Sequence, residues 1–187
     1  MRQRIAVIIG STREGRVGDA IARWFLDRAK QRDDLELDVL DLAEFEFPAR
    51  YPEEVTAEMN RFTGSIDRAD GFVVVTPEYN RSFPSSLKQA IDYAYDEWHA
   101  KPVGFVSYGC RSRGHYAVEG LRVVFTELHT ICVRDEVSVD LMDITLRPDG
   151  SPRHVDGLEP TVTVMLDQLL WWSEALRTAR ATHPYVA

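Results

Sequence analysis

The sequence predicts an α/β fold in which helices cover both faces of a parallel sheet. Short apolar runs without polar alternation, such as residues 5–9 and 71–76, are typical of parallel strands that are buried on both sides. Amphipathic stretches of helical length separate these runs, and that alternation builds parallel sheets. We find no internal repeats or linkers, and 187 residues can bury a sizeable core, so we expect one domain over residues 1–187.

The individual elements follow from local patterns along the chain. The expected strands are rich in Val, Ile and Leu and cover residues 4–9, 35–40, 71–76, 102–107 and roughly 132–139. The expected helices have apolar residues at helical spacing and cover about 18–30, 53–67, 84–98, 114–129 and 159–180. Pro84 suits the first turn of its helix, where a missing N–H costs little. A loop with Pro148, Gly150, Pro152 and Gly157 precedes the last helix.

The last predicted helix carries an apolar stripe. A stripe at this spacing is far more typical of core packing than of a cofactor site. Its members are Val162, Met165, Leu166, Leu169, Leu170, Trp172 and Leu176. Trp171 falls beside the stripe, and we interpret it as a candidate interface residue.

The most informative segment follows the third strand. It reads Pro77-Glu78-Tyr79-Asn80-Arg81-Ser82 and leads into a helix start. This position is the carboxyl end of a strand, where open α/β sheets bind their ligands. Tyr79 offers a ring face, and Asn80 and Ser82 offer hydrogen bonds. Prolines in this segment remove local backbone donors, and the remaining N–H groups are expected to face a ligand. The alternative is a loop that only connects strand to helix.

A second loop follows the first strand and reads Gly10-Ser11-Thr12-Arg13-Glu14-Gly15-Arg16-Val17-Gly18. Free N–H groups at the start of the next helix, with its dipole, favour an anion. Arg13 and Arg16 can add charge-assisted bonds to phosphate oxygens. The Gly-Lys-Ser/Thr of a Walker loop is missing, and the glycines are spaced wrongly for G-x-G-x-x-G. A solvated turn is the alternative for this loop taken alone.

The two loops together favour a mononucleotide site. In a doubly wound sheet the ends of strands one and three flank the switch point, where a mononucleotide binds. One loop would then hold a phosphate, and the other a planar ring. A Ser–His–Asp hydrolase is not supported, because the sequence contains no G-x-S-x-G elbow. The residue that ends strand three is Thr76, so a phosphoacceptor aspartate is also missing there.

Together with Ser107-Tyr108-Gly109 after strand four, these segments resemble the NADPH-dependent FMN reductase family of flavin, quinone, azo-dye and chromate reductases. The resemblance extends from Ile5 to about Arg180. It implies a flavodoxin-like three-layer sandwich with five parallel strands in the order 2-1-3-4-5. It also implies an FMN-dependent NAD(P)H oxidoreductase, with FMN as cofactor, NADPH or NADH as co-substrate, a small-molecule electron acceptor and a homodimer or tetramer as the assembly.

The resemblance also implies which residues bind the cofactor. They are Ser11, Arg13, Arg16, Val17, Gly18, Pro77, Glu78, Tyr79, Asn80, Ser82, Ser107, Tyr108 and Gly109. Backbone N–H groups of the Tyr79–Asn80 and Tyr108–Gly109 turns would hydrogen-bond the ring edge. Because flavin carries the redox chemistry, we expect no catalytic residue beyond the FMN ring. The five histidines lack metal-ligand spacing, so no metal is expected.

Two departures from the family pattern leave alternatives open. Arg113 and His115 stand where relatives often have small residues, and Gly18 stands where many have a polar side chain. These changes could restrict the acceptor or weaken flavin binding. A flavodoxin-like electron carrier, or a flavin-free regulatory descendant, therefore remains as an alternative function.

Composition narrows the partners and the location. The net charge of −8, with no evident basic face, argues against nucleic acid. The first apolar run is too short for a signal peptide or a membrane span, so we expect no membrane partner and a cytoplasmic location. Cys110 and Cys132 form no CxxC pair and are expected to be free thiols.

Overall fold

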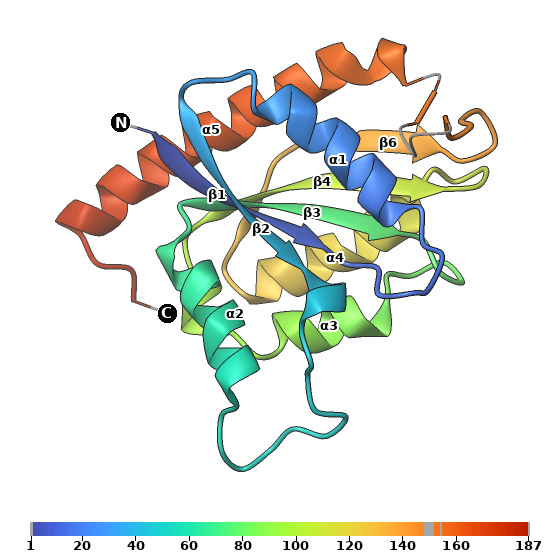
Figure 1. Ribbon diagram of the computed structural model, residues 1–187. Helices are drawn as coiled ribbons and strands as arrows, with labels where there is room; N and C mark the ends of the chain where they lie inside the picture. The colour runs from blue at the N-terminus through green and yellow to red at the C-terminus, as the bar shows by residue number, and fades with distance from the viewer. Residues whose placement is uncertain (1, 148–151, 154, 187) are drawn as a thin grey trace.

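The computed structural model describes residues 2–147, 152–153 and 155–186 (Figure 1). Its centre is a parallel sheet in the order β2-β1-β3-β4-β5, with β6 also paired to β4, which confirms the predicted strand order. The strands are β1 (Gln3–Ile9), β2 (Leu35–Asp41), β3 (Gly71–Pro77), β4 (Pro102–Gly109), β5 (Ile131–Cys132) and β6 (Val137–Asp140). Pro148 and Gly150 of the predicted loop lie outside the described residues.

The predicted fifth strand, 132–139, is wrong as one continuous element. β5 pairs with the beginning of β4, and β6 pairs with its end. Between them the backbone is bonded to side chains of flanking helices. Arg122 donates to the carbonyl oxygen of Arg134 at 3.2 Å, and the N–H of Asp135 donates to Gln168 Oε1 at 3.1 Å. These side-chain contacts replace sheet bonds, so the strand is split.

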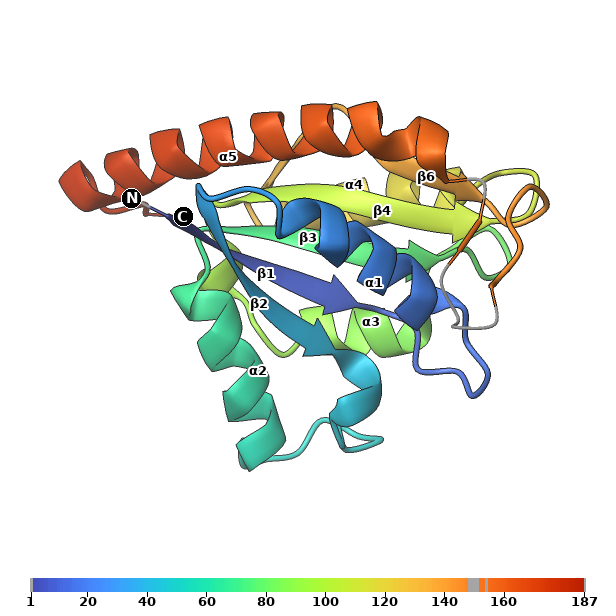
Figure 2. The same cartoon turned by 45° about the horizontal axis from the view of Figure 1, so that its top comes forward.

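Helices cover both faces of the sheet (Figures 1 and 2). They are α1 (Gly18–Ala29), α2 (Ala57–Arg68), α3 (Ser85–Ile91), α4 (His115–Glu127) and α5 (Glu159–Thr182), with short 3-10 helices η1 (Leu42–Glu44), η2 (Asp96–Trp98) and η3 (Asp156–Leu158). α1 and α5 pack on one face, while α2, α3 and α4 pack on the other. This three-layer arrangement confirms the predicted fold class.

Two helix boundaries differ from the prediction for identifiable reasons. α2 begins at Ala57 rather than near residue 53, because the Thr56 hydroxyl accepts the N–H of Met59 at 3.2 Å and caps the helix there. The helix expected over 84–98 ends at Ile91. The Trp98 indole donates to the carbonyl oxygens of Ile91 and Ala94, both at 3.1 Å, and these are acceptors that a continued helix would use.

The unbroken apolar strands are explained by two cores. Ile5 and Val7 of β1 face the layer of α1 and α5, whereas Ala6 and Ile8 face the opposite layer. The residues of β3 and β4, and nearly all of those of β1, are therefore buried on one face or the other without polar alternation, whereas the edge strand β2 includes exposed residues such as Glu36. Among the described residues, no helix is long and apolar enough to cross a membrane.

The stripe of α5 is core as far as Leu170, while Leu176 is only half-buried and Trp172 is exposed. Val162, Met165 and Leu169 are almost completely buried. Trp172, however, is 37% exposed and packs edge-to-face against Trp171, which is 64% exposed, with their ring centroids 4.9 Å apart. The assignment of Trp172 to the core was wrong, because its position lies at the outer margin of the stripe.

Candidate functional site

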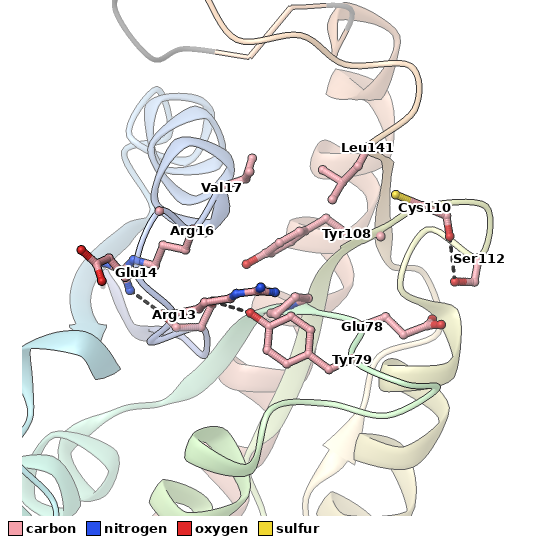
Figure 3. Close-up of a pocket in the computed structure, with 14 residues that line it drawn as sticks. Arg13, Glu14, Arg16, Val17, Glu78, Tyr79, Tyr108, Cys110, Ser112 and Leu141 are labelled. Atoms are coloured by element: carbon pink, nitrogen blue, oxygen red, sulfur yellow. Dashed lines mark hydrogen bonds between the residues drawn. The ribbon is translucent and has the colours of Figure 1, made fainter.

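The loops after β1, β3, β4 and β6 meet at the carboxyl edge of the sheet and line a pocket of about 530 Å³ (Figure 3). Because β1 lies beside β3 and β3 beside β4, their ends come together as expected for a switch point. The volume lies within the range of roughly 300–1,000 Å³ that is common for ligand pockets. The lining residues are Ser11, Arg13, Glu14, Gly15, Arg16, Val17, Pro77, Glu78, Tyr79, Tyr108, Gly109, Cys110, Ser112 and Leu141.

Most of the expected site residues line this pocket, and four do not. The four are neighbours in the chain of residues that line the pocket, but are not part of its lining: Gly18, Asn80, Ser82 and Ser107. Sequence reasoning missed Glu14, Gly15, Cys110, Ser112 and Leu141. The first four lie within loops that the motifs already marked. No sequence motif marked Leu141, which follows β6 and reaches the pocket from there. The end of the fifth strand had not been predicted to contribute to the site.

The first loop presents a helix start to the pocket. α1 begins at Gly18, and its N-cap residue Val17 makes no side-chain capping bond. The N–H group of Ala20 already donates to the carbonyl oxygen of Val17 at 3.0 Å, so the N–H groups of Gly18 and Asp19 are those that remain for an anion, together with the positive end of the helix dipole. Arg13 is exposed, and Figure 3 shows its side chain extended into the pocket near Tyr79 and Tyr108.

Arg16 has a partner within the protein. Its guanidinium forms a two-point ion pair with Asp41 at the end of β2, with Nη1 2.6 Å from Oδ1, and it also donates to the carbonyl oxygen of Ser11. The hydrogen bonds to Asp41 raise the pKa of Arg16 above its ordinary value. Arg16 thus ties the loop to β2, and a direct bond from it to a phosphate stays a prediction.

The second loop is a tight hairpin. Tyr79 and Ser82 exchange backbone bonds of 2.8 and 3.0 Å, and Asn80 and Arg81 both have positive φ, at 51° and 64°. This is the geometry of a type I′ turn, which Asn tolerates well. Of the N–H groups in the Tyr79–Asn80 turn that were expected to face a ligand, that of Tyr79 donates to the carbonyl oxygen of Ser82 instead, while that of Asn80 stays a prediction. The turn instead presents the Tyr79 side chain, whose hydroxyl is 3.1 Å from Ser11 Oγ.

The hairpin is fixed to α4 by two contacts that the sequence did not predict. Glu78 Oε2 accepts the N–H of Tyr116 in the first turn of α4 at 3.2 Å. The Arg81 guanidinium lies 4.4 Å from the centre of the Tyr116 ring. Glu78 therefore acts as a helix cap from a distance, which favours a role in positioning Tyr79.

The third loop, after β4, is ordered by Ser107. Its buried hydroxyl donates to the carbonyl oxygen of Arg113 at 2.8 Å. Gly114, at φ 90°, packs so closely that a Cβ there would lie 2.6 Å from Ser107 Cβ. This contact explains why Ser107 does not line the pocket.

Arg113 and His115 each have a carboxylate partner. Arg113 Nε lies 3.4 Å from Asp140 Oδ2, and His115 Nδ1 lies 2.6 Å from Glu136 Oε1. Neither residue is among those that line the pocket. The two departures from the family pattern therefore contact carboxylates near β6.

Tyr108, at the end of β4, forms the wall between the first loop and Leu141 (Figure 3). The residue is 3% exposed, and burial raises the pKa of its hydroxyl well above the ordinary value. The hydroxyl therefore remains protonated at physiological pH and is available as a donor.

A second pocket, of about 640 Å³, lies at the opposite edge of the sheet, where Asp70 and Lys101 precede β3 and β4. Its lining also includes Asp67, Asp96, Glu97 and Arg180. The charges are of both signs, and the Lys101 ammonium already donates to two backbone carbonyls. The smaller pocket lies at the carboxyl ends of β1 and β3, where doubly wound sheets bind their ligands, so we take it as the candidate site.

The family model for NADPH-dependent FMN reductase matches residues 3–142, which is most of the chain. The chain belongs to the NADPH-dependent FMN reductase family. An NAD(P)H-dependent FMN reductase of Nectria sp. is 38% identical over 120 residues, covering 57% of this chain and 59% of that protein. A quinone reductase of Pseudomonas putida is 34% identical over 113 residues, covering 55% and 58%. The match thus spans less than two thirds of the length of these two relatives.

Solved structures confirm the fold of this FMN reductase family member. FerB, a flavoenzyme NAD(P)H:(acceptor) oxidoreductase from Paracoccus denitrificans, superposes with a TM-score of 0.76 at 22% identity, covering 92% of this chain and 98% of FerB. The apo form of the NADH:FMN oxidoreductase EmoB superposes with a TM-score of 0.67 at 18% identity, covering 95% and 89%.

Proposed function

We propose that the protein is an FMN-dependent NAD(P)H oxidoreductase that reduces a small-molecule acceptor. The observation that carries this proposal is the pocket at the ends of β1, β3 and β4, which joins a helix start to two aromatic side chains. The family membership supports it, since relatives are named as NAD(P)H-dependent FMN reductases, quinone reductases and azoreductases.

The residues present fit FMN. Uncapped N–H groups of α1 and the exposed Arg13 suit a phosphate that carries close to two negative charges. Tyr79 and the 108–110 segment offer apolar and backbone surface to a planar ring on the other side of the pocket. The buried Tyr108 hydroxyl has no hydrogen-bond partner within the described part of the chain, as expected of a group that awaits a ligand.

Bound FMN would supply the redox chemistry, accepting hydride from NADPH or NADH and reducing a second substrate. The protein would bind and orient the ring, so we expect no catalytic residue beyond it. Glu78 supports this view, because its carboxylate is used at the start of α4. Tyr79, held by its hairpin and by Ser11, would fix the position of the ring.

The acceptor is proposed only as a class. The candidates are flavin, quinones, azo compounds and metal oxyanions. The quinone and azo reductases among the relatives favour the organic acceptors. Both cysteines of the chain are free, which agrees with a reducing compartment, and the cytoplasm stays the proposed location.

The test is anaerobic stopped-flow mixing of the FMN-reconstituted protein with NADPH or NADH, followed by a quinone. A reductase loses its flavin absorbance rapidly on mixing and regains it when the quinone is added. A flavodoxin-like carrier hardly reacts with either nicotinamide. A protein that shows no flavin bands after reconstitution would contradict the proposal altogether.

A further inference from the structure

The side chain of Tyr108 has an unused polar group at the candidate site. Its hydroxyl is buried and has no hydrogen-bond partner among the residues that the structure describes. The Ser11 hydroxyl lies near enough to act on Tyr108 as a weak hydrogen-bonding neighbour, which offsets a small part of the rise in the Tyr108 pKa, but its 3.1 Å hydrogen bond is with the Tyr79 hydroxyl. A buried hydroxyl without a partner destabilises a protein, so such a group points to a ligand.

The position of this hydroxyl is tied to Gly18. A Cβ added to Gly18 would collide with Tyr108 Oη, which fills the space that a side chain would take there. Gly18 is the first residue of α1, and the preceding Val17 provides no side-chain cap. The first turn of α1 thus lacks a side-chain hydroxyl of its own, and Tyr108 brings one to the same place from β4.

The chemistry of this place favours an anion. Burial keeps the pKa of Tyr108 high, so Oη carries a proton that it can donate. It lies beside Gly18 at the start of α1, where the first backbone N–H groups of the helix are also donors. Figure 3 shows the Arg13 side chain extended across the pocket near Tyr108, and that side chain is exposed and can move toward an incoming anion.

We propose that the Tyr108 hydroxyl donates a hydrogen bond to the phosphate of the bound flavin nucleotide, and that Gly18 is required to make room for it. This inference rests on the proposed function, because it assigns a phosphate ligand within the FMN pocket. Tyr108 thereby discriminates FMN from riboflavin, which has the same ring and sugar chain but no phosphate.

The experiment compares Tyr108→Phe, Gly18→Ser and the double variant by titrating each protein with FMN and with riboflavin. Tyr108→Phe removes only the hydroxyl and should weaken FMN binding roughly 10- to 100-fold, the usual loss for a hydrogen bond to a charged group. Riboflavin binding should be unchanged. Tyr95→Phe is the matched control, since Tyr95 is exposed and lies outside this pocket.

The double variant tests the link to Gly18. Gly18→Ser alone should weaken FMN binding because its side chain collides with Tyr108 Oη. In the double variant the collision is relieved and the serine hydroxyl takes over, so FMN should bind more tightly than in either single variant. Inorganic phosphate should compete with FMN less well in Tyr108→Phe than in the wild type, a readout that does not need riboflavin.

The outcomes separate the two proposals. Equal losses for FMN and riboflavin in Tyr108→Phe would mean that the hydroxyl contacts the ring or sugar, and would overturn the inference. Unchanged FMN affinity would also overturn it while the proposed function stands. A wild-type protein that binds neither flavin would overturn the proposed function and this inference together.

Discussion

Arg13 and Arg16 occupy equivalent positions in the sequence pattern but differ in the structure. Arg16 is paired with Asp41, whereas Arg13 is exposed and extends into the pocket. Arg13→Ala should therefore weaken FMN binding by roughly 1.5–3 kcal/mol, the value of a hydrogen bond to a charged group. Fluorescence titration measures it, with Arg134→Ala, whose side chain is 89% exposed, as the control. Unchanged affinity in Arg13→Ala would remove this residue from the phosphate site.

Substitutions at Asn80 can show whether this residue serves to form the hairpin turn or contacts the ligand with its side chain. Its φ of 51° suits Asn or Gly and is strained for a β-branched residue, by roughly 1–2 kcal/mol. Asn80→Gly should therefore retain FMN affinity and thermal stability, while Asn80→Val should lower both. If titration shows that Asn80→Gly loses as much affinity as Asn80→Val, the Asn80 side chain itself contacts the ligand.

At the residue scale, sequence reasoning predicted which loops form the pocket but not how their side chains are used. Residue types and their place after strands marked Arg16, Glu78 and Ser107. Their partners Asp41, Tyr116 and Arg113 could not be predicted, because they depend on the folded path of the chain: Arg16 reaches the end of β2, Glu78 reaches the start of α4, and Ser107 bonds to the backbone further along its own loop. A short motif contains no information on such pairings.

Lys101 stabilises the end of an element rather than a site. Its ammonium donates to the carbonyl oxygens of Ile66 and Asp67, at 2.8 and 2.7 Å, in the last turn of α2. Burial lowers its pKa from 10.5 to about 8. The unfolded chain then binds more protons than the folded one between these pKa values, so Lys101 makes the free energy of unfolding rise with pH across that interval.

Lys101→Met should remove this dependence. The unfolding free energy of the wild type, relative to the variant, should rise by about 2 kcal/mol between about pH 7.5 and about pH 9.5. Urea unfolding at the two pH values measures the difference. The raised pKa of Cys132, about 11, acts in the opposite direction but is common to both proteins. A difference that stays constant with pH would show that Lys101 titrates as an ordinary surface lysine.

At the element scale, the strands were more predictable than the helix ends. Burial on both faces leaves a clear apolar signature in β1, β3 and β4. The end of α3 depends on where the Trp98 indole finds its acceptors, and the split between β5 and β6 depends on Arg122 and Gln168. Such tertiary contacts override local pattern.

For the whole molecule, we predict a homo-oligomer with a two-fold dimer as the minimal unit. Aromatic residues are enriched at interfaces, and three of them lie between α3 and β4. Trp98 is core and Tyr93 is buried, whereas Tyr95 is 57% exposed. Trp171 offers a second exposed aromatic surface on α5. Light scattering at low micromolar concentration should give at least twice the chain mass of 21.3 kDa. Comparing Tyr95→Glu with Trp171→Glu locates the face, and a mass near 21.3 kDa in the wild type would contradict the prediction.

The ion pair between Arg16 and Asp41 has a consequence for ionic strength. Asp41 neutralises the charge of Arg16, and the pocket lining also contains the carboxylates of Glu14 and Glu78, which offset the positive charge of Arg13. The net charge of the whole chain is −8. Capture of a flavin nucleotide would then depend on oriented N–H and O–H groups at close range, which salt screens little. Added salt should instead screen the long-range repulsion between protein and nucleotide. We therefore expect flavin association to become faster, rather than slower, as salt is raised.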